Sequence, residues 1–275
     1  MVLEQLYPSS WVEKKTRFAF VMGASYAVLG IASALLLFPQ DPGLASVAFT
    51  SLLLLPTLNR MLSIEEKQAA QDKFNLLTPF KDHTDIFKVY AFLFIGVLLV
   101  FSFFAIALPS IATSQMFEPQ VRILGYIGQA YSDDAYFSIL VNNLTVFFFC
   151  LMASFIYGAG SIFIIIWNAS AWGVVFGIVA RNSAMATSQN PFAYFLLTFL
   201  AVLPHMLSEA SAYCLAAISG GVISKAVIKE KMSSPQFNKI VKDGLVIFGL
   251  AILILVVAAF IEVYITPYLL RLFGV

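Results

Sequence analysis

Long apolar runs separated by short polar stretches make up most of the chain. A helix needs about 20 apolar residues to cross about 30 Å of hydrocarbon. Such runs lie near residues 18–38, 88–110, 136–157, 158–180, 192–218 and 244–270, and a shorter run near 44–60 contains Pro56. The pattern predicts an all-α polytopic transmembrane helix bundle of six or seven spans. The count depends on 44–60, which either spans fully, is re-entrant or forms half of a hairpin with the first span.

The basic residues favour seven spans. With seven, 13 of the 16 lysines and arginines share one side of the membrane with the N-terminus. They are Lys14, Lys15, Arg17, Arg60, Lys67, Lys73, Lys81, Lys88, Lys225, Lys229, Lys231, Lys239 and Lys242. Only Arg122, Arg181 and Arg271 remain for the other side. Because cytoplasmic loops are enriched in lysine and arginine, we predict a cytoplasmic N-terminus.

The composition supports a membrane protein. Hydrophobic residues make up 60% of the 275 residues and charged residues 11%, whereas soluble domains have roughly 25% charged residues. We therefore predict a multi-pass protein of the cell membrane, with the lipid bilayer as its surroundings and the first apolar run retained rather than cleaved. The net charge of +1 gives no basic excess for binding nucleic acid. Cys150 and Cys214 lie in apolar runs and are expected to behave as small hydrophobes.

The loops leave no room for a soluble catalytic domain. We predict one transmembrane domain over 1–275, with an N-terminal helical hairpin and cytoplasmic loop over 1–87 and a core over 88–275. The 61–87 loop begins as a mixed-charge helical pattern and ends at a Thr78–Pro79 turn. Asp133 and Asp134 fit a solvated helix cap better than a metal site.

Glycines predict two kinds of close contact. Gly158 and Gly160 permit a tight turn, so the spans on either side are expected to form an antiparallel pair. Small residues at spacings of four form a face on each of two spans: Gly173 with Gly177 in 158–180, and Ala19 with Gly23 and Ala27 in 18–38. Close packing within the chain is the favoured interpretation, and a homo-oligomer is the alternative.

Two acids and one histidine lie inside the predicted spans, and no lysine or arginine lies at mid-depth. These three residues are His205, Glu209 and Glu262. Each costs roughly 2.5 to 3.5 kcal/mol to place in hydrocarbon, so such residues usually face a partner or a cavity. His205 and Glu209 are four residues apart and share a helical face, and Pro204 predicts a kink beside them.

Other spans carry polar residues at similar depth. These are Asn142, Asn143, Asn168 and Thr266. If the helices form a bundle, all seven polar residues are expected to meet in one intramembrane cluster. Its simplest role is structural, with interhelical hydrogen bonds from the asparagines and a buried His205–Glu209 latch. The alternative is a proton or cation site at the two carboxyls.

Common catalytic signatures are absent from the sequence. It has no His-Glu-x-x-His zinc motif, no Gly-x-Ser-x-Gly elbow and no phosphate-binding loop. We expect no enzymatic activity and no cofactor. A triad of metal ligands from His205, Glu209 and Glu262 is the weakest alternative, and the pattern leaves the metal question open.

Taken in order, these motifs resemble the stage II sporulation protein M family of integral membrane proteins. The series is Asn142–Asn143, the 157–163 glycine hinge, Trp167 to Ser170, Gly173 to Gly177, Pro204–His205 with Glu209, and Glu262 with Thr266–Pro267. The resemblance covers roughly 88–275, and the N-terminal segment around Trp11 with the first two spans looks like the archaeal-type branch. One departure is Met206, where the family commonly has glycine after proline-histidine.

The resemblance implies a scaffold. In endospore-forming bacteria the family belongs to an engulfment complex that remodels the envelope, and members also occur in organisms that form no spores. We therefore expect an assembly component of a membrane or envelope-remodelling complex, with membrane protein partners. The alternative is a small ion- or proton-coupled transporter or channel that uses Glu209, Glu262 and His205, because proline-broken helices are common at such sites.

Overall fold

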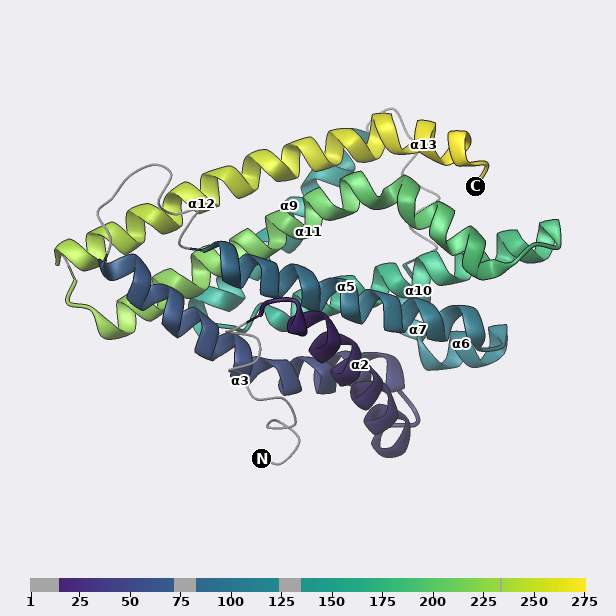
Figure 1. Ribbon diagram of the computed structural model, residues 1–275, viewed down its shortest axis with the longest axis horizontal. Coiled ribbons are helices and arrows are strands. Elements are labelled where there is room, and N and C mark those ends of the chain that lie inside the picture. Colours follow the sequence, from purple (N-terminus) through teal and green to yellow (C-terminus); the bar gives the residue numbers. More distant parts are fainter. Residues whose placement is uncertain (1–14, 72–82, 124–134, 233) are drawn as a thin grey trace.

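All regular structure that the chain shows is helical. The computed structural model describes residues 15–71, 83–123, 135–232 and 234–275 (Figure 1). The predicted Thr78–Pro79 turn, Asp133, Asp134 and the segment around Trp11 lie outside the described residues. The long helices are α2 (Phe18–Leu37), α3 (Pro42–Gln71), α5 (Thr84–Ala107), α9 (Ala135–Tyr157), α10 (Ile162–Thr187), α11 (Pro191–Lys229) and α12 (Pro235–Phe260). The short elements are α6 (Ser110–Met116), α7 (Glu118–Val121), the π-helical turn η2 (Ile261–Ile265) and α13 (Thr266–Phe273).

The described part of the chain has seven helices that are long and apolar enough to cross a membrane. One of them is Pro42–Ile64 in α3, so the 44–60 run belongs to a full-length apolar helix. The last is α12 continued through η2 and α13, over Pro235–Phe273. The prediction of an all-α membrane bundle is therefore confirmed, with seven candidate spans.

Several helices are longer than the apolar runs that predicted them. The helix α3 continues into the mixed-charge segment as far as Gln71, and α11 continues to Lys229. The helix α12 begins at Pro235, nine residues before the predicted span at 244. The Ser234 hydroxyl starts α12 by accepting a hydrogen bond from the Phe237 N–H at 3.0 Å, with proline at the first helical position. An apolar run ends at the first charged residues, whereas the hydrogen bonding of a helix continues through them. Hydropathy therefore predicts helices that are too short.

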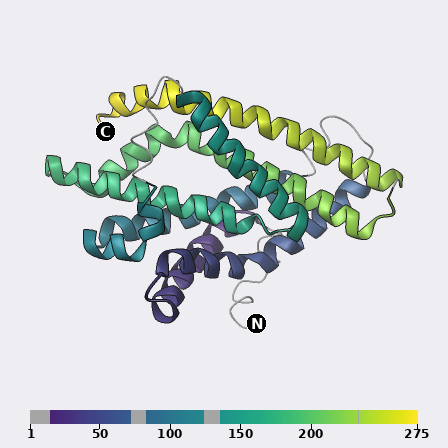
Figure 2. The same cartoon turned by 180° about the vertical axis from the view of Figure 1, so that it is seen from behind.

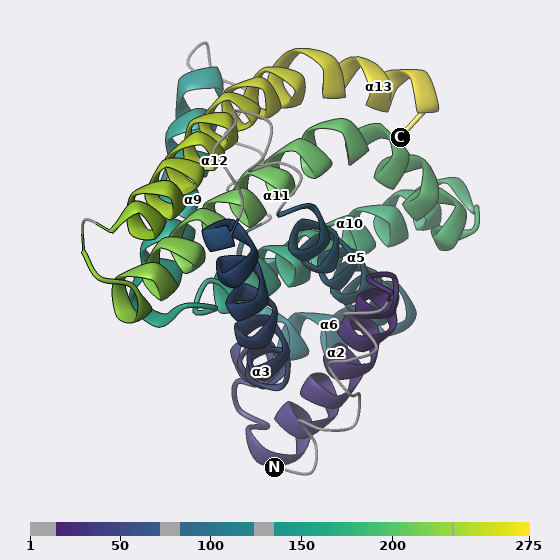
Figure 3. The ribbon, with the colours of Figure 1, turned by 60° about the vertical axis from the view of Figure 1, so that its left-hand side comes forward.

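The helices form two groups that α10 joins. The helix α5 packs against α2 and α10, while α11 packs against α12, α9 and α10. Figure 3 shows α2, α3 and α5 on one side of the molecule and α9, α11 and α12 on the other. Because α10 contacts both α5 and α11, and α3 contacts both α11 and α12, these two helices fix the position of one group relative to the other.

Small residues let the backbones of α2, α5 and α10 approach closely. A Cβ added to Gly173 would lie 2.5 Å from the Leu98 carbonyl oxygen of α5, and one added to Gly23 would lie 2.7 Å from the Leu93 carbonyl oxygen. Gly177 faces α5 in the same way. The predicted small-residue faces are therefore used for packing within the chain.

The turn between α9 and α10 forms as predicted, but the predicted antiparallel pair is wrong. Gly158 adopts a φ of 68°, which glycine tolerates and other residues rarely do. The Asn59 side chain of α3 accepts a hydrogen bond from the Ala159 N–H at 3.3 Å. Figure 2 shows α9 and α10 diverging from this turn, and α9 packs along α11 instead. Gly220 of α11 permits that contact by lying against the Leu151 carbonyl oxygen.

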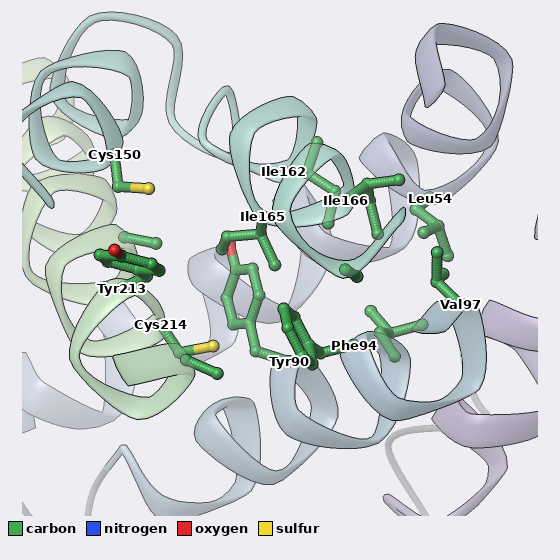
Figure 4. Close-up of a cluster of buried hydrophobic side chains, with 14 of the residues drawn as sticks. Leu54, Tyr90, Phe94, Val97, Cys150, Ile162, Ile165, Ile166, Tyr213 and Cys214 are labelled. Carbon is green, nitrogen blue, oxygen red and sulfur yellow. The ribbon is translucent and has the colours of Figure 1, made fainter. Parts of the chain in front are cut away.

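Large side chains fill the interior between α5, α10 and α11. The buried residues in Figure 4 include Tyr90, Phe94, Val97, Ile162, Ile165, Ile166, Tyr213, Cys150 and Cys214. Both cysteines are free and buried, so they act as small apolar residues, as expected.

We predict that Gly173→Ala destabilises the bundle by about 1–3 kcal/mol, because the new methyl group meets backbone that cannot move aside cheaply. The matched control is Gly249→Ala, since nothing lies within 4 Å of a Cβ added there. Unfolding free energies in detergent would measure both. Equal stabilities for the two variants would show that α5 and α10 do not depend on the close approach.

Candidate functional site

Six of the seven predicted polar residues lie on three segments that pack together. Asn142 and Asn143 are on α9, His205 and Glu209 are on α11, and the C-terminal helix carries Glu262 and Thr266. The helix α11 packs against α9, η2 and α13. We call the following residues the polar cluster: Asn142, Asn143, His205, Glu209, Tyr213, Glu262 and Thr266.

A π-helical turn carries Glu262. Its cause is Pro267, which lacks a backbone N–H and whose ring would meet the Val263 carbonyl of a regular α-helix. The Thr266 N–H instead donates to the Ile261 carbonyl, five residues back. The Thr266 hydroxyl donates to the same oxygen at 3.2 Å. Single π-helical turns inside α-helices occur frequently at functional sites.

His205 ties α11 to this turn. Its Nδ1 lies 2.8 Å from the Thr266 Oγ1, and the two side chains are only 8% and 6% exposed. The Thr266 hydroxyl has one proton, which it gives to the Ile261 carbonyl. Both bonds therefore form together only when Nδ1 of His205 carries the ring proton and donates it to Thr266.

Glu209 bonds within its own helix and meets α9. The Tyr213 hydroxyl donates to Oε1 of Glu209 at 2.5 Å, as their spacing of four residues allows. Asn143 lies close enough to interact with the Glu209 carboxyl, yet its Nδ2 completes no hydrogen bond within the described residues. Its Oδ1 accepts one from Asn142 at 3.2 Å.

Glu262 lies opposite Glu209. The helices α11 and α12 are joined by a short connection and run antiparallel (Figure 1). His205 and Thr266 lie at the same level because their side chains are bonded. Glu209 is one helical turn after His205, and Glu262 is one turn before Thr266. Because the helices are antiparallel, Glu209 and Glu262 also lie at the same level. The two carboxyls are close enough for electrostatic repulsion when both are ionised. Within the described residues, neither is in an ion pair, and Glu262 makes no side-chain hydrogen bond.

Asn168 does not join the cluster. Its Nδ2 donates to the Ile164 carbonyl of its own helix at 2.8 Å. Pro204 lies inside α11, which bends along its length in Figure 1. No three histidine, cysteine, aspartate or glutamate side chains of the described chain converge to hold a metal ion, so the triad of ligands proposed above does not form.

The sequence did not predict the role of Arg181. It was assigned to a loop, but α10 continues to Thr187 and buries this side chain to 9% exposure. Its Nη1 donates to the carbonyls of Ala105 and Leu108 at 2.9 and 2.7 Å and lies 3.0 Å from the Thr113 hydroxyl. Arg181 thus satisfies carbonyls that the end of α5 leaves without helical partners.

Asp243 was also missed. Hydropathy placed it one residue outside the last span, yet it is fully buried on α12 and pairs with Lys239 at 3.3 Å. Beside it, the Ser219 hydroxyl of α11 donates to the Gly244 carbonyl at 2.8 Å. The i, i+4 spacing of Lys239 and Asp243 was visible in the sequence, but it is equally typical of an exposed ion pair.

Comparisons with known proteins match the core of the chain. The family model described as SpoIIM, stage II sporulation protein M, matches residues 90–267, which include the whole polar cluster. A Methanocaldococcus jannaschii protein described as uncharacterized protein MJ0793 is 35% identical over 133 residues, covering 47% of this chain and 70% of that protein. No solved structure matches the chain.

We predict that Thr266→Val lowers the unfolding free energy by about 1 kcal/mol, the scale of an interhelical hydrogen bond in a membrane. In a double-mutant cycle, His205→Phe and Thr266→Val should show a coupling energy of similar size. Unfolding in detergent or bicelles would measure it. The control is Thr145→Val on α9, because that hydroxyl bonds only its own helix. Additive effects of the His205 and Thr266 changes would contradict the link.

Proposed function

The chain belongs to the stage II sporulation protein M family, and from that premise we propose that it is a membrane scaffold. It would recruit protein partners of a membrane or envelope-remodelling complex. The observation that carries the proposal is a folded helical platform at one end of the bundle. We call it the basic platform and define it as residues 59–64 of α3, 219–232 and 235–244.

Helix length supports a position of the basic platform beyond the lipid. The helix α11 has 39 residues and therefore extends about 58 Å along its path, about twice the hydrocarbon thickness. The continuous run over Pro235–Phe273 also has 39 residues. Both must leave the hydrocarbon, and the joined ends of α11 and α12 project at the left of Figure 1. These ends carry Lys225, Lys229, Lys239 and Lys242, which favour the aqueous side.

The basic platform has an interior of its own. The Lys239–Asp243 pair is buried on α12, the Ser219–Gly244 bond joins α11 to α12, and the helix α3 packs against both helices. Gly221 of α11 lies against Leu62 of α3. A rigid surface outside the membrane suits the recruitment of another protein.

The tip of the basic platform exposes apolar side chains. Ile228 and Met232 are 76% and 73% exposed and lie among Lys229 and Lys231. The partner surface that fits is apolar with an acidic rim. The polar cluster supports this role by bonding α11 to α13 farther along the same helices.

A second candidate function is ion- or proton-coupled transport. The specific observation in its favour is the Glu209–Glu262 pair, which lacks a basic partner within the described residues. Flux of protons, sodium and divalent cations into liposomes containing the purified chain would test it. Flux that Glu209→Gln and Glu262→Gln abolish would establish transport, and a sealed protein under every gradient would exclude it.

For the scaffold, we predict that Ile228→Asp with Met232→Asp removes partners that cross-link to the wild-type chain in its native membranes. Buried contacts at the core of an interface usually carry most of the binding energy. A carboxylate introduced there would be buried without a hydrogen-bonding partner. Mass spectrometry after affinity purification would identify the partners.

The matched control is Ile111→Asp on α6, since Ile111 is 75% exposed but lies outside the basic platform. It should retain every partner, and thermal unfolding should show both variants folded. The proposal of a scaffold acting through this surface would be refuted if the variant at the tip still cross-linked to the same partners. It would also be refuted if the wild-type chain cross-linked to no partner.

A further inference from the structure

Two acidic side chains lie at the same level on adjacent helical runs that are long and apolar enough to cross a membrane. Glu209 is 6% exposed on α11, and Glu262 lies opposite it on the π-helical turn η2. We propose that Glu209 and Glu262 form a proton-binding site that holds one exchangeable proton between them. A scaffold can hold such a proton as well as a transporter can, so the site does not depend on either candidate function.

The first argument is charge. Two carboxylates near each other in a medium of low polarity repel strongly, and burial away from water disfavours each charge further. No lysine, arginine or histidine pairs with either one in the part of the chain that is described. The remaining ways to neutralise the pair are a proton and a bound cation.

The second argument is that the surroundings of the pair supply too few ligands for a divalent cation. Calcium takes six to eight oxygen ligands, and magnesium needs a near-ideal octahedron. Here Oε1 of Glu209 is occupied by the Tyr213 hydroxyl, and no group of three candidate metal ligands forms within the described chain. A single proton needs no further ligands.

In the described chain, the other titratable side chains near the two carboxyls are a histidine, a tyrosine and a cysteine. His205 of α11 is engaged with Thr266 through Nδ1, and Tyr213 donates its hydroxyl proton to Glu209. The helix α9 places Asn143 near Glu209 and Cys150 near Tyr213. None of these groups adds a positive charge, so the proton stays with the carboxyls.

The proton can exchange through Glu262. This side chain is half-buried, in contrast to Glu209. It makes no hydrogen bond to other described residues, and it sits on a turn where the regular helix is already interrupted. Glu262 is therefore the outer member of the pair, and Glu209 is the member held in place by Tyr213.

Infrared difference spectroscopy of the purified chain in lipid would test the site. The wild-type protein should show the carbonyl stretch of a protonated carboxylic acid near neutral pH, and the band should disappear as the pH rises while the helical amide band is unchanged. Glu209→Gln and Glu262→Gln should each remove most of the band, because removing one carboxyl ends the repulsion that retains the proton. The control is Glu118→Gln, an exposed carboxylate paired with Arg122, which should leave the band unchanged.

A second measurement covers variants that fold poorly. This measurement needs only the wild-type protein. Its thermal stability should fall as the pH rises through the range in which the acid band is lost, because the folded state there binds one proton more than the unfolded state does. No acid band near neutral pH in the folded wild-type protein would overturn the proposal. So would a band that both glutamine variants, once shown to be folded, retain in full.

Discussion

Hydrocarbon offers no hydrogen-bond partner, so each polar group placed in it must find one within the protein. The break at Pro267 shows the consequence most clearly. The Thr266 N–H and hydroxyl both turn to the Ile261 carbonyl, and the hydroxyl oxygen receives the His205 ring. One broken helix is thereby bonded to its neighbour. Arg181 does the same at the end of α5, where it satisfies carbonyls that the helix leaves free.

The same constraint explains where the polar residues gather. Pro204 and Pro267 lie inside the two longest helical runs, and the polar cluster lies on the segments around them. Elsewhere the helices are held by close packing of small residues, as at Gly173 against Leu98. Packing of that kind has little tolerance for substitution, whereas the cluster joins its helices through specific bonds. The bundle therefore contains a tightly packed part around α5 and a hydrogen-bonded part around α11.

The helices α11 and α12 connect the two features that bear on function. A bond from Ser219 to Gly244 joins α11 to α12 within the basic platform, and the His205–Thr266 bond joins α11 to α13, which continues the same run. The proposed proton site at Glu209 and Glu262 and the proposed partner surface of the basic platform therefore lie on the same two helical runs.

The sequence by itself determined the class of the protein, the seven apolar helices and most of the cluster. These are local properties: an apolar run of sufficient length must be helical in lipid, and a spacing of four residues places His205 and Glu209 on one face. The series from Asn142 to Pro267 also placed the chain in its family, which the match over 90–267 confirms. Only the tertiary structure decided which helices meet. It separated Asn168 from the cluster, placed α9 along α11, and buried Asp243 and Arg181. Hydropathy could not show this, because the burial of a charged residue depends on neighbours that lie far away in the sequence.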